Sequence, residues 1–212
     1  MDAITPVFDA EFRAQFHELL RWRRDVRRFR TESVPREMLD ELLSLAALAP
    51  SVGLSQPWRF VLVESPAGRA AIRDNFAAAN AEALTGQAPG KSALYARLKL
   101  AGLDAAPVQF ALFCEHDPAQ GHGLGRRTMP QTLAYSAVMA VHTMWLAARV
   151  VGLGLGWVSI LDPVAAKSAL DVPEDWDFIG YFCLGWPEAE ELVPELEREG
   201  WEKRRSLEVL RR

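Results

Sequence analysis

Cysteine and histidine are scarce in this sequence. Its 212 residues include 2 cysteines and 4 histidines, and none of them shows the Cys-x-x-Cys or Cys/His spacing of a metal site. Cys114 and Cys183 each lie in an apolar stretch, which is typical of buried thiols in a reducing compartment. His142 falls on the apolar pattern of a predicted helix, where we expect a core histidine rather than a ligand. The sequence therefore predicts free, buried thiols and no metal.

Long hydrophobic runs are also missing. The longest candidate, Ala134–Leu155, is interrupted by His142, Arg149 and several glycines, so we expect no membrane span. The N-terminus has neither a basic n-region nor an apolar h-region, so we expect no signal peptide. Together these features predict a soluble, cytoplasmic protein that binds no membrane.

A large excess of charge is absent as well. The formal net charge is −4, which argues against non-specific binding to nucleic acid. The basic residues nevertheless cluster at 21–30 and 203–212, so a local anion site remains open. Half of the residues are hydrophobic, and a length of 212 residues favours a single domain, 1–212, with a sizeable core.

The spacing of apolar residues predicts alternating helices and strands. Helical spacing predicts helices over 10–24, 36–48, 130–151 and 163–170. Apolar runs predict strands over 59–64, 108–115, 152–160 and 178–185. Residues 66–103 are expected to form two helices around a flexible loop at 85–90, and they add little obvious core. Strands separated by helices predict a mixed sheet flanked by helices, in an α/β or α+β layer fold.

The segment Arg23-Arg24-Asp25-Val26-Arg27-Arg28 concentrates guanidinium groups near the N-terminus. Such a concentration indicates a bound anion, and phosphate matches the fork geometry of arginine. Lys203-Arg204-Arg205 could close the same phosphate site from the other end of the chain. Asp25 lies in the middle of the cluster, where it either balances charge or faces a ligand as a reacting group.

Three further motifs have a structural and a functional interpretation. The polar stretch 51–58 is either an ordinary loop or a source of hydrogen-bond donors for a ligand with carbonyl and ring-nitrogen acceptors. Gly152-Leu153-Gly154-Leu155-Gly156 follows a helix and precedes a strand, the reverse of the dinucleotide-binding order, so helix caps and close backbone approach explain it better. Ser159 lies in no nucleophile elbow, but it could donate a hydrogen bond to a polar ligand edge.

Taken together, the motifs resemble those of the nitroreductase-like flavoproteins, and within them the chain is similar to the 5,6-dimethylbenzimidazole synthases of cobalamin biosynthesis. The resemblance runs from about residue 12 to residue 207. It rests on Arg23–Arg27, Ala49–Gly53, Gln56–Trp58, Leu98–Leu100, Gly125–Arg126, Thr128–Gln131, Tyr135–Ser136, Leu146–Arg149, Gly154–Ile160, Glu195–Leu196 and Gly200–Trp201. One departure is Thr132-Leu133, where the family often has Met-Asp.

The resemblance implies an α+β nitroreductase-like fold with a central mixed sheet, a helical lid at 66–103 and an extended C-terminal tail. It implies that reduced FMN is consumed as a substrate with O2, which yields 5,6-dimethylbenzimidazole and erythrose 4-phosphate. It also implies a homodimer with FMN at the subunit interface. A separate flavin reductase would supply the reduced FMN.

The resemblance also implies roles for individual residues. Asp25 and Ser159 match the family's catalytic residues, and we expect Asp25 to move protons while Ser159 holds the flavin edge. The residues that match the phosphate-binding set are Arg23, Arg24, Arg27 and Arg204. Those expected to contact the rest of the flavin are Ser51, Gly53, Gln56, Lys99 and Gly156, with Lys99 on the lid.

Two other functions are compatible with flavin binding. An NAD(P)H-dependent nitroreductase or flavin reductase would retain FMN and need room for nicotinamide over the ring, which a lid at 66–103 argues against. A non-catalytic flavin-binding protein would need the arginines and the loop around Ser51–Gln56, but it would not need Asp25.

Overall fold

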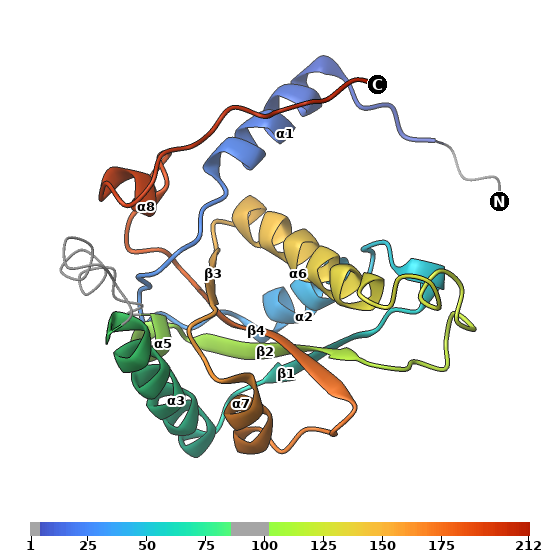
Figure 1. The fold of residues 1–212 in the computed structure, drawn as a ribbon. Helices are drawn as coiled ribbons and strands as arrows, with labels where there is room; N and C mark the ends of the chain where they lie inside the picture. Colours follow the sequence, from blue (N-terminus) through green and yellow to red (C-terminus); the bar gives the residue numbers. More distant parts are fainter. Residues whose placement is uncertain (1–4, 86–101) are drawn as a thin grey trace.

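A four-stranded sheet forms the centre of the computed structural model, which describes residues 5–85 and 102–212 (Figure 1). The strand order is β1-β2-β4-β3, so that β1 and β3 form the two edges. The strands are β1 (Trp58–Leu62), β2 (Val108–Glu115), β3 (Gly154–Val158) and β4 (Trp176–Gly185). The four predicted strands are therefore present, with β3 shorter than expected.

All three strand pairs of this sheet are antiparallel. The expected mixed sheet is thus wrong for the pairing of these strands, although the α+β class holds. The connections from β1 to β2 and from β3 to β4 join antiparallel neighbours, whereas the connection from β2 to β3 joins strands that run in the same direction with β4 between them. Among the described residues, the one parallel pairing is a single bridge between Asp25 and Leu155.

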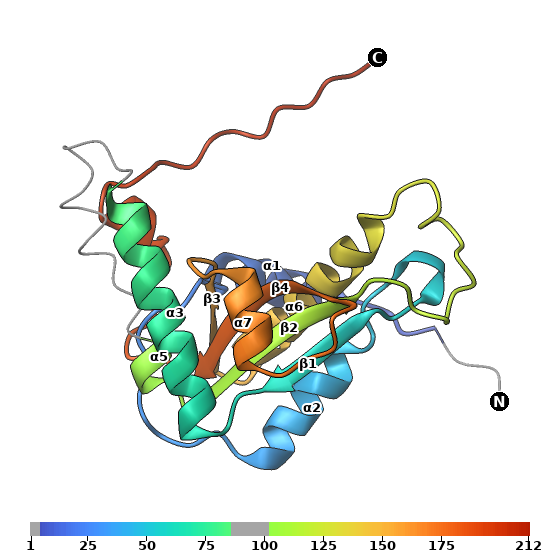
Figure 2. The same cartoon turned by 60° about the horizontal axis from the view of Figure 1, so that its bottom comes forward.

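Helices cover both faces of the sheet (Figures 1 and 2). On one face lie α2 (Arg36–Ala46) and α6 (Thr132–Val150), and on the other lie α3 (Pro66–Thr85), α5 (Gly102–Ala105) and α7 (Pro163–Ala169). Two further helices, α1 (Ala10–Trp22) and α8 (Glu195–Arg198), lie outside these layers. A short 3-10 turn, η1, spans Val52–Leu54. After α8, residues 202–212 form no regular structure and run away from the body, which confirms the extended tail.

Two hydrophobic layers result from the alternation of side chains along the central strands. On β2, Phe110 and Leu112 face the layer formed with α2 and α6, whereas Ala111 and Phe113 face the layer formed with α3, α5 and α7. All four of these side chains are fully buried. Burial on both faces explains why β2 reads as a nearly continuous apolar run.

The helix α6 is the main support of the first layer. It is also long and apolar enough to cross a membrane by length and composition alone. Its buried side chains, however, pack against the sheet and α2, as in the core helix of a soluble protein.

Cys114 and Cys183 are both free and buried, as predicted, and burial raises the pKa of each thiol to about 12.

The first half of the predicted lid is attached to the body. In α3, Ile72 is fully buried in the second layer, and the Arg69 guanidinium donates to the carbonyl oxygens of Val63 and Pro107 at 2.9 and 2.8 Å. The segment therefore adds more core than its sequence suggests. Lys99 and the rest of 86–101 lie outside the described residues, so a lid there stays a prediction.

Ile72→Ala is expected to lower the free energy of unfolding by about 3 kcal/mol, because it leaves a cavity in the second layer. Arg73→Ala is the matched control on the same helix, since the Arg73 side chain is 43% exposed and its loss is expected to cost less than about 0.5 kcal/mol. Chemical denaturation measures both values. Equal, small effects of the two substitutions would show that α3 is not part of the core.

Candidate functional site

The arginine-rich segment is extended rather than helical. The helix α1 ends at Trp22, and Arg23 already has extended backbone angles. The N–H of Val26 donates to the carbonyl oxygen of Leu155 at 3.1 Å, beside the bridge between Asp25 and Leu155. The segment therefore pairs with β3, an edge strand whose outer backbone groups would otherwise lack partners.

Glycines in β3 allow this close approach. A Cβ on Gly156 would collide with the carbonyl oxygen of Val26, and a Cβ on Gly154 would press on the Val26 side chain. Gly152 has a φ of +80° just after the end of α6, which suits a glycine at a helix C-terminus. The motif 152–156 thus has the capping and close-approach roles expected from its position.

Asp25 is fixed against β3 by its side chain as well as its backbone. Its Oδ1 accepts a hydrogen bond from the N–H of Trp157 at 2.9 Å, and its Oδ2 lies 3.5 Å from Nε of Arg27. Burial raises the pKa of Asp25, while the Trp157 N–H and the charges of Arg27 and Arg23 oppose that rise. A carboxyl group that keeps its proton more readily than usual, yet stays 38% exposed, is suited to proton transfer.

Arg23 and Arg24 are anchored to the C-terminal part of α6. The Arg23 guanidinium lies 5.1 Å from the centroid of the Trp145 ring, and Nε1 of Trp145 donates to the carbonyl oxygen of Arg24 at 3.0 Å. Nε of Arg24 is buried and has no hydrogen-bond partner within the described part of the chain. A buried donor without a partner is costly in a protein, unless a ligand supplies the acceptor.

Arg204 approaches the same two arginines from the C-terminal tail. Burial lowers the pKa of both Arg23 and Arg24, and the positive charge of Arg204 lowers both further. Nε of Arg204 lies 3.9 Å from Oε2 of Glu197. Three guanidiniums that crowd one another suit an anion such as phosphate, as the sequence predicted.

Among the described residues, no group of at least 3 His, Cys, Asp or Glu could hold a metal ion.

Arg27 does not belong to the group formed by Arg23, Arg24 and Arg204, which is called the arginine group below. Its Nε lies 3.5 Å from Oδ2 of Asp25 and 3.6 Å from Oε2 of Glu195, and its side chain is only 13% exposed. The structure therefore directs Arg27 toward two carboxylates rather than toward the other arginines. Sequence reasoning missed Glu195 as a partner of Arg27, because 168 positions separate the two along the chain.

The polar loop 51–56 lies at the other end of α6. The N–H of Val52 donates to Oγ of Ser136 at 3.0 Å, near the start of that helix. Ser136 and Trp145 are nine positions apart, or about 14 Å along the helix axis. The predicted site residues of one chain thus form two separate groups, which Figure 1 shows at the two ends of α6.

Within the loop, backbone geometry is tightly constrained. Gly53 has a φ of +57°, and a Cβ there would lie 2.8 Å from the carbonyl oxygen of Leu124. Oγ of Ser51 accepts from the N–H of Gln56 at 3.1 Å, and Gln56 itself has a φ of +43°. The Gln56 side chain accepts from Gln120. These contacts hold the loop in one conformation.

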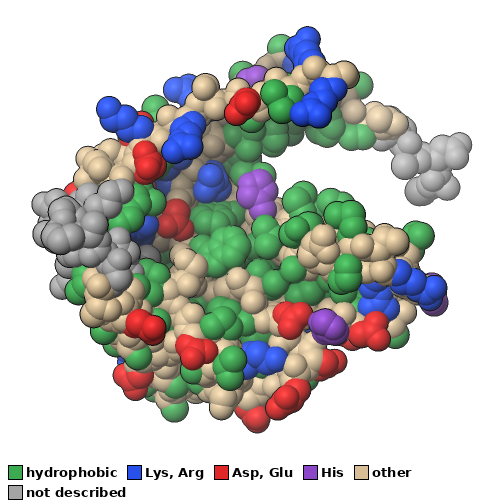
Figure 3. Space-filling view, in the orientation of Figure 1, with side chains coloured by type: hydrophobic (Ala, Val, Ile, Leu, Met, Phe, Trp, Pro, Cys, Tyr) green, Lys and Arg blue, Asp and Glu red, His purple; other side chains and the backbone are tan. Residues whose placement is uncertain are grey.

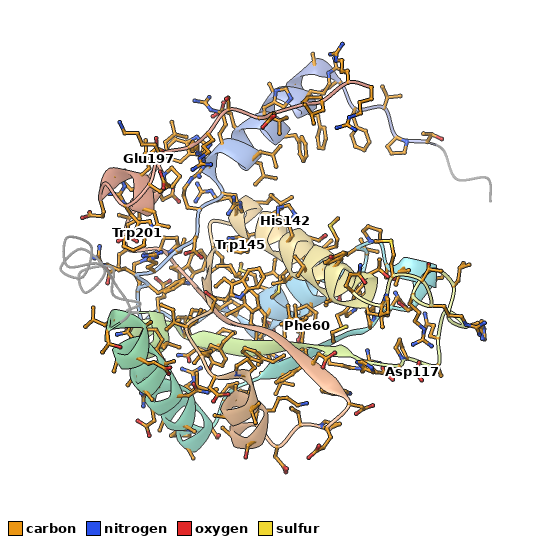
Figure 4. The ribbon with its side chains drawn as sticks, viewed as in Figure 1. Phe60, Asp117, His142, Trp145, Glu197 and Trp201 are labelled. Carbon is orange, nitrogen blue, oxygen red and sulfur yellow. The ribbon has the colours of Figure 1, made fainter. Side chains whose placement is uncertain are left out.

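Ser159 and His142 are two further polar residues that the sequence analysis singled out. Ser159 is exposed one residue beyond β3 and two residues after Trp157. His142 is exposed on α6, which overturns the expectation of a core histidine. Partial desolvation of its ring lowers its pKa, and the charge of Arg23 lowers it further. Figure 4 shows His142 and Trp145 on the side of α6 that faces α1.

Comparison with known proteins gives both a family and close relatives. The profile of the nitroreductase family matches residues 20–186. The chain is 54% identical to the 5,6-dimethylbenzimidazole synthase of Rhodospirillum rubrum, over 98% of each chain. It is 48% identical to a 5,6-dimethylbenzimidazole synthase of Rhodobacter capsulatus, over 97% of this chain and 99% of the relative.

A solved structure agrees with the fold. The chain is similar to an iodotyrosine deiodinase bound to FMN and 3-iodo-L-tyrosine, with a TM-score of 0.72 over 92% of this chain and 97% of that one. The two sequences are 24% identical, so this likeness supports the fold alone. The predicted nitroreductase-like fold is thereby confirmed.

Gly156→Ala is expected to displace Val26 and to lower the free energy of unfolding by about 2 kcal/mol, through overpacking against backbone. Hydrogen exchange provides the specific readout, because the N–H groups of Val26 and Trp157 are expected to lose their protection. Gly200→Ala is the control, since Gly200 has a φ of +73° with nothing within 4 Å of its Cβ. That change is expected to cost about 1 kcal/mol from backbone strain alone. Unchanged protection in the Gly156 variant would contradict the assignment.

Proposed function

Because the chain belongs to the nitroreductase family, and within it to the 5,6-dimethylbenzimidazole synthases, we propose that it fragments reduced FMN with O2. The products are 5,6-dimethylbenzimidazole and erythrose 4-phosphate. The observation that carries the proposal is Asp25, a carboxyl group of raised pKa that is held beside Arg23, Arg24 and Arg204, whose positive charges oppose one another. Flavin binding alone requires the arginines, but it does not require this carboxyl group.

The arginine group fits the phosphate of FMN. Arg23, Arg24 and Arg204 would hold it. Nε of Arg24, which is buried and has no partner in the part of the chain that the structure describes, offers a donor. Arg27 has a different role in this proposal, because its guanidinium is taken up by Asp25 and Glu195. It sets the position and charge of Asp25 rather than binding phosphate.

The remaining residues act on protons and on orientation. Reduced FMN, when bound, supplies both the electrons for O2 and the ring that is broken. Asp25 holds and releases protons near that ring, and the N–H of Trp157 keeps one of its oxygens in place. Ser159, exposed beyond the end of β3, donates a hydrogen bond to the flavin edge. Lys99 and the lid would exclude water, as the resemblance implies.

The site is completed by a second copy of the chain in this proposal. One chain holds its two groups of predicted residues at opposite ends of α6, so the loop with Ser51, Gly53 and Gln56 would contact the flavin held by the partner's arginines. We propose a homodimer with FMN at the interface for this reason. A separate flavin reductase supplies the reduced FMN.

The helix α1 offers a surface for this dimer. None of its residues is buried, and Phe8, Phe12, Phe16 and Leu20 follow one another along one side of the segment at four-residue spacing. Their exposed fractions are 56, 46, 42 and 43%, which is unusual for large apolar side chains that lie together. A cavity of about 520 Å³ lies between α1 and α6, and Figure 3 shows the hollow beneath α1 with hydrophobic side chains on its walls.

Asp25→Asn is expected to bind reduced FMN with nearly unchanged affinity but to lower the yield of 5,6-dimethylbenzimidazole by at least about 100-fold. The amide keeps the shape of the side chain and the hydrogen bond from Trp157, but it cannot take up and release a proton at neutral pH. The measurement is aerobic incubation with chemically reduced FMN, followed by mass detection of the benzimidazole.

Asp40→Asn is the control, because Asp40 pairs with Arg36 on α2, away from the arginine group. It is expected to retain the wild-type yield. Recovery of intact FMN from the wild-type protein would refute the proposed reaction. Oxidation of NAD(P)H in that case would favour a reductase, and no oxidation would favour a flavin-binding protein.

Phe16→Asp is expected to convert the dimer to a monomer and to weaken FMN binding, because it places a charge in the apolar surface of α1. Sedimentation velocity measures the assembly, and fluorescence titration measures FMN binding. Ala14→Asp is the control, since position 14 lies on the opposite side of the same helix. A dimer that survives the Phe16 substitution with full FMN affinity would exclude α1 from the interface.

A further inference from the structure

The carboxylates of Asp25 and Glu195 share the guanidinium of Arg27. Nε of Arg27 lies almost equally far from Oδ2 of Asp25 and Oε2 of Glu195, at 3.5 and 3.6 Å. The side chains of Arg27 and Glu195 are only 13% and 15% exposed, so water screens this contact weakly. Oε1 of Glu195 also lies 3.8 Å from Nη2 of Arg28, which is 57% exposed.

Backbone contacts of the chain that precedes α8 set the position of Glu195. It begins the short helix α8, directly after Pro194. The chain that leads to α8 is tied to the arginine-rich segment, because the N–H of Glu188 donates to the carbonyl oxygen of Arg28 at 3.2 Å. A bridge between Phe29 and Pro187 joins the same two segments. Glu195 therefore faces Arg27 as a result of backbone pairing between distant parts of the chain.

The groups that act on Asp25 come from four elements. Arg23 and Arg27 belong to its own segment, and β3 contributes the N–H of Trp157. The strand β4 contributes the Cys183 thiol, which stays neutral because its pKa is about 12. On α8, Glu195 contacts the same Arg27 guanidinium that contacts Asp25.

We propose that Glu195 is a positioning residue that raises the proton affinity of Asp25 by competing with it for Arg27. An ion pair with a guanidinium favours the ionised form of a carboxyl group, and sharing that guanidinium weakens the effect for each partner. The negative charge of Glu195 also disfavours a second negative charge nearby. The importance of Glu195 for the reaction rests on the proposed role of Asp25. Its effect on the protonation of Asp25, however, does not require flavin.

Glu195→Gln tests the proposal, because the amide keeps the size and the hydrogen-bonding oxygen of Glu195 but removes its charge. Arg27 would then serve Asp25 alone, and the titration midpoint of Asp25 is expected to fall by about one pH unit. Carbon-13 NMR of the aspartate carboxyl groups measures the midpoint in the full-length protein without FMN. Loss of a signal in Asp25→Asn assigns the resonance.

Glu191→Gln is the matched control, since Glu191 lies in the same segment and pairs with Arg198 at 3.5 Å. It removes an equal charge without touching Arg27 and is expected to leave the midpoint unchanged. Glu195→Asp keeps the charge, so its midpoint is expected to stay near the wild-type value even if the shorter side chain lowers stability. An unmoved Asp25 midpoint in Glu195→Gln would overturn the proposal, whether or not the protein makes benzimidazole.

Discussion

The pairing of the arginine-rich segment with β3 is the contact on which the site depends. It requires glycine at 154 and 156, because the Val26 peptide lies where side chains would otherwise stand. It also requires an edge strand with free backbone groups, which the strand order provides. Through this pairing, Asp25 meets the N–H of Trp157 and the arginines reach the end of α6.

The extended backbone of residues 23–27 also gives the arginines of this segment two different roles. Side chains at alternate positions of an extended chain share a side, so Arg23 and Arg27 both act on Asp25. Arg24, whose Nε is buried, is instead crowded by the charges of Arg204 and Arg23. In this arrangement one part of the cluster suits an anion, while Arg27 engages carboxylates. A helix through the same residues would have distributed these charges around its axis and lost the separation.

Much of this fold is readable from periodicity, and the exceptions have physical causes. The apolar run of β2 and the buried Cys114 and Cys183 follow from hydrophobic pattern, since burial depends mainly on local composition. The exposure of His142 could not be read in this way, because α6 is apolar on most sides and only its neighbours decide which side is covered. The attachment of α3 through Arg69 likewise depends on tertiary structure, because one of its acceptors is the carbonyl group of Pro107, 38 positions away.

The sequence by itself determined the chemical groups: a carboxyl group among guanidiniums, a polar loop before a strand, and glycines after a long apolar helix. It determined these because residue identity and short spacing need no knowledge of the rest of the chain. Only the tertiary structure decided which guanidiniums crowd one another and which one is shared by Asp25 and Glu195. Electrostatic interactions depend on distance and burial, and both are set by the pairing of segments far apart in the sequence.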